Sequence, residues 1–561
     1  MAMTWGCWMP RLLLPQTAEN WTEPQRRLVL LHELAHIKRW DCATNLLTQL
    51  ICALYWTKVL SPVFLAHSQP SRWAYWGPAK GTVALPAGKS VRLVVRNLTA
   101  LNDLSPLAAL AADDLTELSV SGDNNPRHAG DVILPHLRGL SGLKVLFLNL
   151  RDLTPKAMSC LSEMRSLQRL WIHTYPRSAK PEPGSSSRQL DDACLEMVAG
   201  LRSLDSLNLS SQEMTDQSLT NLTALAHLQE LDLWSPKIQG PGLVSLEKLP
   251  ALRRLRLGGL EISDNLLRPL AVLKSLRTLD LRYVKIAEAG GMAYLRQLDQ
   301  LEDLTLWGTA SSAQGLAHLQ PLRNLKHLDL AMGGPNPVRP GDAAAVPLRE
   351  LSSLERLRLV DFDFSDIGLA QLAQLTHLRS LELDSRMDLD PQTNRVYYSD
   401  SGLRALSPLR RLERLVVGSP RITDEGLASV AQFHRLKDLE LSASGVSNDG
   451  LRHLAALASL ESLSLGVPRV TISGLNHLNA LTNLLRLQLR FIRQDNRGLN
   501  LSRLKKLEEF DLTMRHHLEA GRWPRVEEVR DGGRGVGVRH QGAAQPPPAS
   551  RRERCRPETN A

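Results

Sequence analysis

Two histidines and a glutamate near the start of the chain have the types and spacing to hold and use a zinc ion. In the run His32-Glu33-Leu34-Ala35-His36, a helix would place the two imidazoles one turn apart on one face, where both can reach one Zn2+ ion. The Glu33 carboxylate would lie beside the metal-bound water, whose pKa the zinc lowers, and would take its proton. The motif therefore predicts hydrolysis by a zinc-activated water.

The residues around this motif resemble a known family. The flanks at 3–6, 10–15, 26–41 and 45–56 are similar to the BlaR1/MecR1-type membrane metallopeptidases of family M56. The resemblance implies a zinc endopeptidase with His32 and His36 as zinc ligands, Glu33 as general base and Asp41 orienting the site from behind the ligands. Members of that family are integral membrane proteins that cleave a repressor or a sensor segment after a signal.

The chain departs from this family after Trp56, where the family has an acidic stretch that supplies the third zinc ligand. No Asp or Glu occurs between Trp56 and Asp103, and His67 is the remaining candidate, although a lone histidine is more often a surface or packing residue. Catalytic zinc usually has three protein ligands. We therefore expect a truncated, inactive peptidase segment, with Zn2+ as the candidate cofactor. The alternative is a membrane-associated zinc endopeptidase that uses the rest of the chain for sensing or substrate recruitment.

An apolar stretch at residues 43–66 approaches the length of a membrane span. It contains Asn45, Gln49, Lys58 and Pro62, which fit a buried or interfacial helix instead. The first residues lack the charged start and apolar core of a signal peptide. We expect a cytoplasmic or membrane-associated protein, with membrane contact through 43–66 left open.

A Leu-x-x-Leu-x-Leu motif that recurs about every 24 residues occupies most of the chain. A fixed period of this length is typical of stacked supersecondary units rather than of one globular core. Sixteen copies start at residues 115, 143, 167, 204, 228, 252, 276, 301, 325, 354, 378, 412, 436, 460, 484 and 507.

Each copy predicts a strand, a turn and a helix. The alternating leucines suit a short strand with one buried face. A Ser/Thr-Asp pair and leucines at helical spacing follow, as in Ile-Thr-Asp-Glu-Gly-Leu at 422–427. The hydroxyl or carboxylate can accept hydrogen bonds from the free N–H groups of a helix start.

This pattern resembles the leucine-rich-repeat superfamily over roughly residues 91–515, and its Ser/Thr-Asp-x-Gly-Leu form is similar to a bacterial subclass. The resemblance implies an α/β solenoid, with a curved parallel sheet on the concave face and helices on the convex face. We expect a small helical M56-like segment at 1–66, a linker at 67–90, a solenoid of about 16 repeats at 91–515 and a disordered tail at 516–561. The tail is rich in Gly, Pro and Arg and cannot bury a core.

Three repeats carry insertions after their strands. These insertions lie in the steps from residue 167 to 204, from 325 to 354 and from 378 to 412. They would emerge at one edge of the sheet, as the lip of a binding site or as neutral surface loops.

The strand residues between the buried leucines should point out of the concave face. Aromatic residues beside charges are typical of protein-binding hot spots, whereas single exposed aromatics occur on any surface. We expect a protein partner there. The candidate contact residues are Phe147, Trp171, Asp232, Trp234, Arg256, Asp280, Arg282, Trp307 and Asp329.

The net charge of +10 does not by itself indicate nucleic-acid binding. Part of the excess lies in the tail, and along the repeats Arg and Lys mix with Asp and Glu. No basic stripe with interleaved aromatics is visible, so we expect no nucleic-acid partner.

Overall fold

The chain divides into two compact units, Met1–Ala310 and Ser311–Ala561. The computed structural model describes residues 3–5, 11–13, 63–69, 72–78, 91–96, 107, 110–121, 129–150, 153–174, 190–259, 264–282, 284, 288–307, 312–332, 339–384, 396–493, 495, 499–514 and 537–539.

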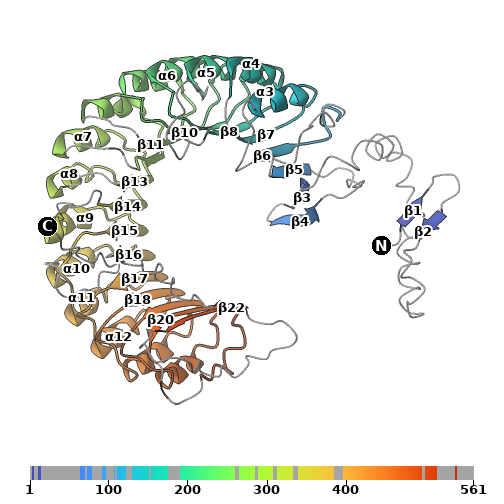
Figure 1. The fold of residues 1–561 in the computed structure, drawn as a ribbon. Helices are drawn as coiled ribbons and strands as arrows, with labels where there is room; N and C mark the ends of the chain where they lie inside the picture. The colour runs from blue at the N-terminus through green and yellow to red at the C-terminus, as the bar shows by residue number, and fades with distance from the viewer. Residues whose placement is uncertain are drawn as a thin grey trace, which may run out of the picture. The chain divides into compact units, whose positions relative to one another are not determined.

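The first unit is built on a parallel sheet whose strands pair in the order of the sequence. The repeat spacing sets the register, so that Leu231 lies opposite Leu207 on one neighbour and Leu255 on the other. The strands line one side of this unit and the helices line the other (Figure 1). The strands are β5 (Val91–Arg96), β6 (Glu117–Ser121), β7 (Val145–Asn149), β8 (Arg169–His173), β9 (Ser206–Ser210), β10 (Glu230–Trp234), β11 (Arg254–Gly258), β12 (Thr278–Asp280) and β13 (Asp303–Trp307).

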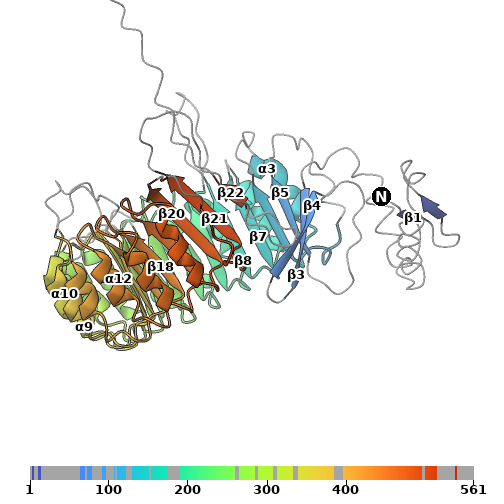
Figure 2. The same ribbon diagram turned by 90° about the horizontal axis from the view of Figure 1, so that it is seen from below.

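The second unit repeats this arrangement. Leu439 lies opposite Leu415 and Leu463 in neighbouring parallel strands, and Figure 2 shows the neighbouring strands β20 and β21 side by side. Its strands are β14 (His327–Ala331), β15 (Arg356–Val360), β16 (Ser380–Asp384), β17 (Arg414–Gly418), β18 (Asp438–Ser442), β19 (Ser462–Gly466), β20 (Arg486–Ile492) and β21 (Glu509–Met514). β19 lies between β18 and β20. Each of the sixteen predicted motif copies is therefore a strand, from β6 to β21.

Short helices follow the strands, and several are tight 3-10 turns rather than the predicted α-helices. In the first unit they are α3 (Ala129–Ile133), η4 (Leu134–Leu137), α4 (Pro155–Ser159), η5 (Cys160–Glu163), α5 (Asp192–Val198), α6 (Asp216–Asn221), η6 (Leu222–Ala224), η7 (Pro241–Lys248), η8 (Asp264–Val272) and α7 (Glu288–Leu295). In the second they are α8 (Ala313–Ala317), η9 (Gly341–Ala344), α9 (Ala345–Arg349), α10 (Asp366–Leu372), α11 (Asp400–Ala405), α12 (Asp424–Val430), η10 (Gly450–Ala456) and η11 (Gly474–Ala480).

Leucines from strands and helices close the core of each repeat. In the repeat that starts at Leu228, the strand residues Leu231 and Leu233 each expose 1% of their surface. Leu243 and Leu246 from η7 are fully buried against the same layer. Truncating a buried leucine of this kind to alanine costs about 2–5 kcal/mol. The motif leucines thus supply the main stabilising term of the fold.

Aspartates at the helix starts link five of the repeats to the next one. Asp400 accepts a hydrogen bond from the backbone N–H of Thr423 at 2.8 Å and another from its hydroxyl at 2.6 Å. Thr423 in turn caps its own helix, because its hydroxyl accepts from the N–H of Glu425. The hydroxyl therefore caps as predicted, and the carboxylate adds a link between repeats. Matching links join Asp192 to Thr215, Asp342 to Ser365, Asp366 to Ser399 and Asp424 to Ser447.

The glycine of the Ser/Thr-Asp-x-Gly-Leu motif leaves room for this carboxylate. A Cβ atom at Gly426 would lie 2.4 Å from Oδ1 of Asp400, and one at Gly402 would lie 2.6 Å from Oδ1 of Asp366. Such approaches are too short for unbonded atoms. The motif thus combines a cap, a link and the space that the link requires.

Strands occur in the region predicted to be a helical segment and a linker. β1 (Met3–Trp5) and β2 (Arg11–Leu13) pair antiparallel. β3 (Val63–Gln69) and β4 (Arg72–Pro78) form an antiparallel hairpin across the expected boundary at residue 66. The prediction of a helix at 63–66 and of a plain linker was wrong there, because β3 pairs with β5 and covers the edge of the parallel sheet. The rest of 1–66 lies outside the described residues.

A short strand also occurs in the predicted disordered tail. β22 (Gly537–Arg539) pairs in parallel with β21. The outer strand of the last repeat presents unpaired backbone N–H and C=O groups, to which another segment can pair as a strand. The other residues of 516–561 are not among those described, and neither are the insertions at 175–189, 333–338 and 385–395.

Candidate functional site

The candidate contact residues of the first unit lie on the strand side of its sheet. Along β10, Leu231 and Leu233 face the core, whereas Glu230, Asp232 and Trp234 face the other way and are half-buried. The same alternation recurs in the neighbouring strands. It brings residues from successive repeats into rows. The sequence predicted that these residues point away from the core, but it did not predict the rows.

A row of alternating charges crosses β10, β11 and the end of β12. Arg256 donates from Nη1 to Oδ2 of Asp232 at 3.0 Å and from Nε to Oδ2 of Asp280 at 2.9 Å. Nε of Arg282 lies 3.1 Å from the same Asp280 oxygen. Burial raises the pKa of Asp232, and the Arg256 guanidinium opposes this shift. The row therefore consists of groups that hold one another in place.

Asp280 is the anchor of this row rather than an exposed contact. It exposes 4% of its surface and receives the guanidinium groups of Arg256 and Arg282 from two sides. The sequence predicted a contact with the partner, but long arginine side chains from adjacent positions cover the carboxylate. Asp280 therefore holds the two arginines in place and is itself covered by them.

Arg282 is held in a defined orientation while much of it stays accessible. Its guanidinium carbon lies 4.6 Å from the ring centroid of Trp307, and its side chain is 40% exposed. Cation–π attraction on one side and the Asp280 carboxylate on another restrict its rotamers.

Trp234 packs over a pair of glycines. A Cβ at Gly258 would lie 3.0 Å from Cδ1 of Trp234, and one at Gly259 would lie 2.5 Å from its Nε1. Gly259 also has a φ of +69°, a conformation that favours glycine. The indole can therefore lie flat against the end of β11, on the same side of the sheet as Arg282.

Phe147 and Trp171 form a second aromatic contact, on β7 and β8. Their ring planes meet at 70°, and the guanidinium of Arg92 lies 5.5 Å from the centroid of Phe147. Both candidate aromatics are thus supported by neighbours from adjacent strands.

A hollow lies over β9, between the larger side chains of β8 and β10. The outward residues of β9 are Ser206, Asn208 and Ser210, which pair with Arg169, Trp171 and His173 on one side and with Glu230, Asp232 and Trp234 on the other. Small side chains between two rows of large ones leave a trough. The pattern is present in the sequence, because aligning the motif copies places Ser206, Asn208 and Ser210 between larger residues of the two flanking copies.

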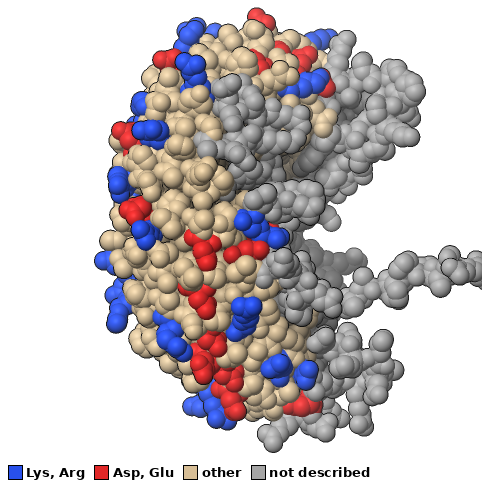
Figure 3. All heavy atoms as spheres, turned by 90° about the vertical axis from the view of Figure 1, so that its left-hand side faces the viewer, with Lys and Arg blue, Asp and Glu red and all other residues tan. Residues whose placement is uncertain are grey.

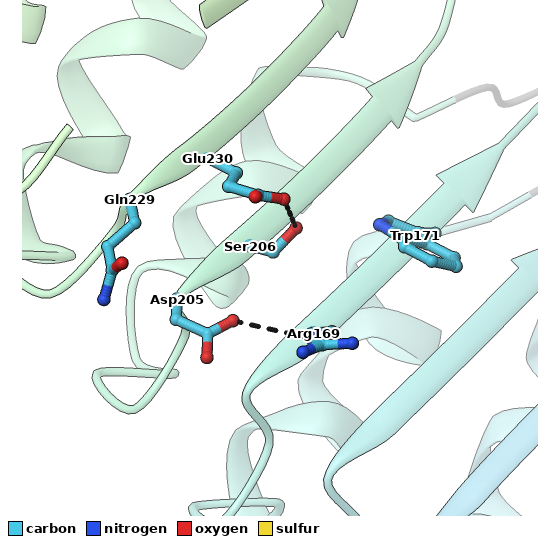
Figure 4. Close-up of a pocket in the computed structure, with 6 residues that line it drawn as sticks. All are labelled: Arg169, Trp171, Asp205, Ser206, Gln229 and Glu230. Carbon is cyan, nitrogen blue, oxygen red and sulfur yellow. Dashed lines mark hydrogen bonds and ion pairs between the residues drawn. The ribbon is translucent and has the colours of Figure 1, made fainter. Parts of the chain in front are cut away.

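One end of this trough is a pocket of about 260 Å3, which we term the β9 pocket (Figure 4). The Arg169 and Asp205 side chains approach to 4.0 Å, and Ser206 donates to Glu230 at 3.2 Å. Burial raises the pKa of Asp205, Arg169 opposes the shift, and Glu230 adds to it. The lining residues are Arg169, Trp171, Asp205, Ser206, Gln229 and Glu230.

Residues 2–66 match the family model described as BlaR1 peptidase M56. Three solved structures are similar to this chain. An internalin, InlF, from Listeria monocytogenes is 21% identical, with 65% of this chain and 90% of that chain covered and a TM-score of 0.42. The LRR protein LIC12759 of Leptospira interrogans is 20% identical, with 73% and 93% covered and a TM-score of 0.37. TLR13, solved in complex with ssRNA13, is 19% identical, with 76% and 60% covered and a TM-score of 0.45. No curated protein matches the sequence.

The in-register ladder of leucine-lined parallel strands, each followed by a short helix, decides the fold. The repeats form a leucine-rich-repeat solenoid. In a solenoid of this kind the helices space the repeats and the strands present aligned side chains. The rows described above are therefore a direct product of the repeat architecture.

The last candidate residue, Asp329, belongs to the strand face of the second unit. Nη1 of Arg358 lies 3.6 Å from Asp329, and its Nε lies 3.2 Å from Glu382. Glu382 also pairs with Nε of Arg414 at 2.7 Å. The second unit of the leucine-rich-repeat solenoid thus carries a charge row of its own, in which Asp329 takes part.

Both signs of charge are scattered over the face of the solenoid shown in Figure 3. The predicted absence of a nucleic-acid partner stays a prediction from the sequence.

The predicted zinc residues His32, Glu33, His36 and Asp41 lie outside the described residues, as does most of 43–66. Within the described part of the chain, no helix combines the length and apolarity needed to cross a bilayer. The zinc site and the membrane contact therefore remain predictions from the sequence.

Proposed function

We propose that this chain is a protein-binding scaffold, and that the strand face of the first unit recognises the partner. The observation that carries the proposal is the Arg282 side chain, held between Asp280 and Trp307. Trp234, packed against Gly258 and Gly259, lies on the same side of the sheet. We propose that the M56-like segment at 1–66 is inactive in this role.

The composition and rigidity of this face favour protein binding. Trp and Arg dominate binding hot spots because they bury large areas and pair directionally. A partner that docks on Arg282 and Trp307 loses less side-chain entropy, since their rotamers are already restricted. The exposed part of Arg282 can also pair with a carboxylate or carbonyl of the partner.

Alanine variants test the proposal. A partner captured with the full chain from a lysate of the source organism should bind Trp234→Ala/Trp307→Ala at least about 30-fold more weakly, since a hot-spot truncation costs about 2 kcal/mol or more. Val244→Ala is the matched control, because Val244 is a 54% exposed apolar residue on η7 in the same unit. Unchanged affinity in the double variant, with circular dichroism like the wild type, would refute the proposal.

A second candidate function is a membrane-associated zinc endopeptidase of the BlaR1 type, with the repeats as sensor or substrate-recruiting domain. The match of residues 2–66 to the BlaR1 peptidase M56 model supports it. It requires stoichiometric zinc on His32 and His36 and proteolysis that Glu33→Gln abolishes. We expect neither, because no acidic residue stands between Trp56 and Asp103 to complete the ligand set. Metal analysis of the purified full chain, with His36→Ala as control, distinguishes the two functions.

A further inference from the structure

The β9 pocket has a floor and walls of different chemistry, in contrast to the flat rows of charge on β10 to β12. Trp171 and Arg169 form one wall, Ser206 the floor, and Glu230 and Asp205 the other side (Figure 4). The pocket exists because Ser206 is small while its partners in register, Arg169 and Glu230, are long. Its volume of about 260 Å3 is enough for one long side chain.

The charges of the lining are not balanced. Arg169 is the cation, whereas Asp205 and Glu230 are two carboxylates. The contact between Arg169 and Asp205 is a long ion pair of 4.0 Å, and both side chains are substantially exposed, at 57% and 39%. Glu230 also pairs with Arg254 at 2.7 Å, from outside the lining. With Arg254 counted, two arginines match the two carboxylates, but only Glu230 is closely paired. An entering cation would lie between two carboxylates that repel each other and would compete only with Arg169 for the loosely held Asp205.

We infer that the β9 pocket receives a lysine or arginine side chain of the protein partner. This inference rests on the proposed function and names the partner's chemistry at one point. The methylenes of the side chain pack against Trp171, and the charged end pairs with Asp205 and Glu230 while Arg169 swings out. An anionic group would meet the same two carboxylates and is disfavoured.

Peptides of defined sequence test this directly. The probes are acetyl-Gly-Ser-Lys-Ser-Gly-amide and versions with Arg, Gln or Glu at the centre, titrated into the full chain. The readout is the indole N–H resonance of Trp171, assigned by its loss in Trp171→Phe. The Lys and Arg peptides should bind saturably and about tenfold more tightly than the Gln peptide, since a cation–π contact and exposed ion pairs each contribute on the order of 1 kcal/mol.

Isosteric variants locate the effect. Asp205→Asn/Glu230→Gln should remove the preference for basic peptides and keep the circular dichroism of the wild type. Glu302→Gln is the matched control, because Glu302 pairs with Arg277 elsewhere on the same unit; it should keep the preference.

Three results would overturn the inference: equal affinity for the Lys and Gln peptides, no saturable shift with any peptide, or tightest binding of the Glu peptide. Its failure is distinguishable from failure of the proposed function. Loss of partner binding in Trp234→Ala/Trp307→Ala would still support a protein-binding face, even where the peptides show no basic preference.

Discussion

At the scale of the residue, the strand face works through side chains that position one another. Asp280 orients two arginines without being exposed, and Trp307 holds one of them. Strand alternation in the sequence predicts which residues leave the core. It cannot predict that Asp280 is covered, because the cover comes from arginines on neighbouring positions whose rotamers depend on the assembled sheet.

The Asp192 carboxylate gives a prediction about pH. Burial favours its neutral form, but hydrogen bonds from Ser218 and Thr215 outweigh this and lower its pKa from 3.8. A lowered folded pKa means that the charged group stabilises the fold above the unfolded pKa, and that this contribution is lost as the pH falls through the folded value.

Asp192→Asn should therefore lower the free energy of unfolding at pH 7 by about 1–2 kcal/mol, which appears as a lower urea midpoint. The difference in free energy between the variant and the wild type should shrink below about pH 4. Urea titrations of both chains from pH 7 to pH 3 measure this. A deficit that is constant, or larger in acid, contradicts the role given to the carboxylate.

At the scale of the element, one short motif supplies a cap, a link and a space. The sequence alone predicted every strand from β6 to β21 and the hydroxyl caps, because leucine spacing and capping act within a repeat. It did not predict the aspartate links, since these join residues such as Asp400 and Thr423 that become neighbours only when repeats stack. The same holds for the β9 pocket, which three strands build together.

Gly426→Ala tests the space that the motif reserves. The new Cβ would lie 2.4 Å from Oδ1 of Asp400, so the carboxylate must move and its two hydrogen bonds to Thr423 must break. We expect a loss of about 2–4 kcal/mol in unfolding free energy by chemical denaturation.

Gly139→Ala is the matched control for this substitution, because its nearest contact would be 3.7 Å, an ordinary van der Waals distance. That variant should stay within about 1 kcal/mol of the wild type. Equal effects at the two glycines would show that the motif glycine is not kept for the carboxylate.

At the scale of the whole molecule, the chain joins a repeat scaffold to a segment with a different chemical signature. The fold of the repeats followed from a period of about 24 residues, because each unit contacts mainly its neighbours. The structure of the segments on either side of the repeats could not be predicted from this period. Pairing of β3 with β5 and of β22 with β21 depends on sheet edges that exist only after the repeats assemble.

The central claim is that the strand face of the first unit binds a protein, and hydroxyl-radical footprinting of the complex tests it most directly. Oxidation rates of Trp234 and Trp307 report their side-chain accessibility without any substitution. We expect the bound partner to slow the oxidation of both tryptophans severalfold, while Val244 on the helix side reacts as in the free chain. Unchanged rates at the two tryptophans, with protection on the helix side instead, would contradict it.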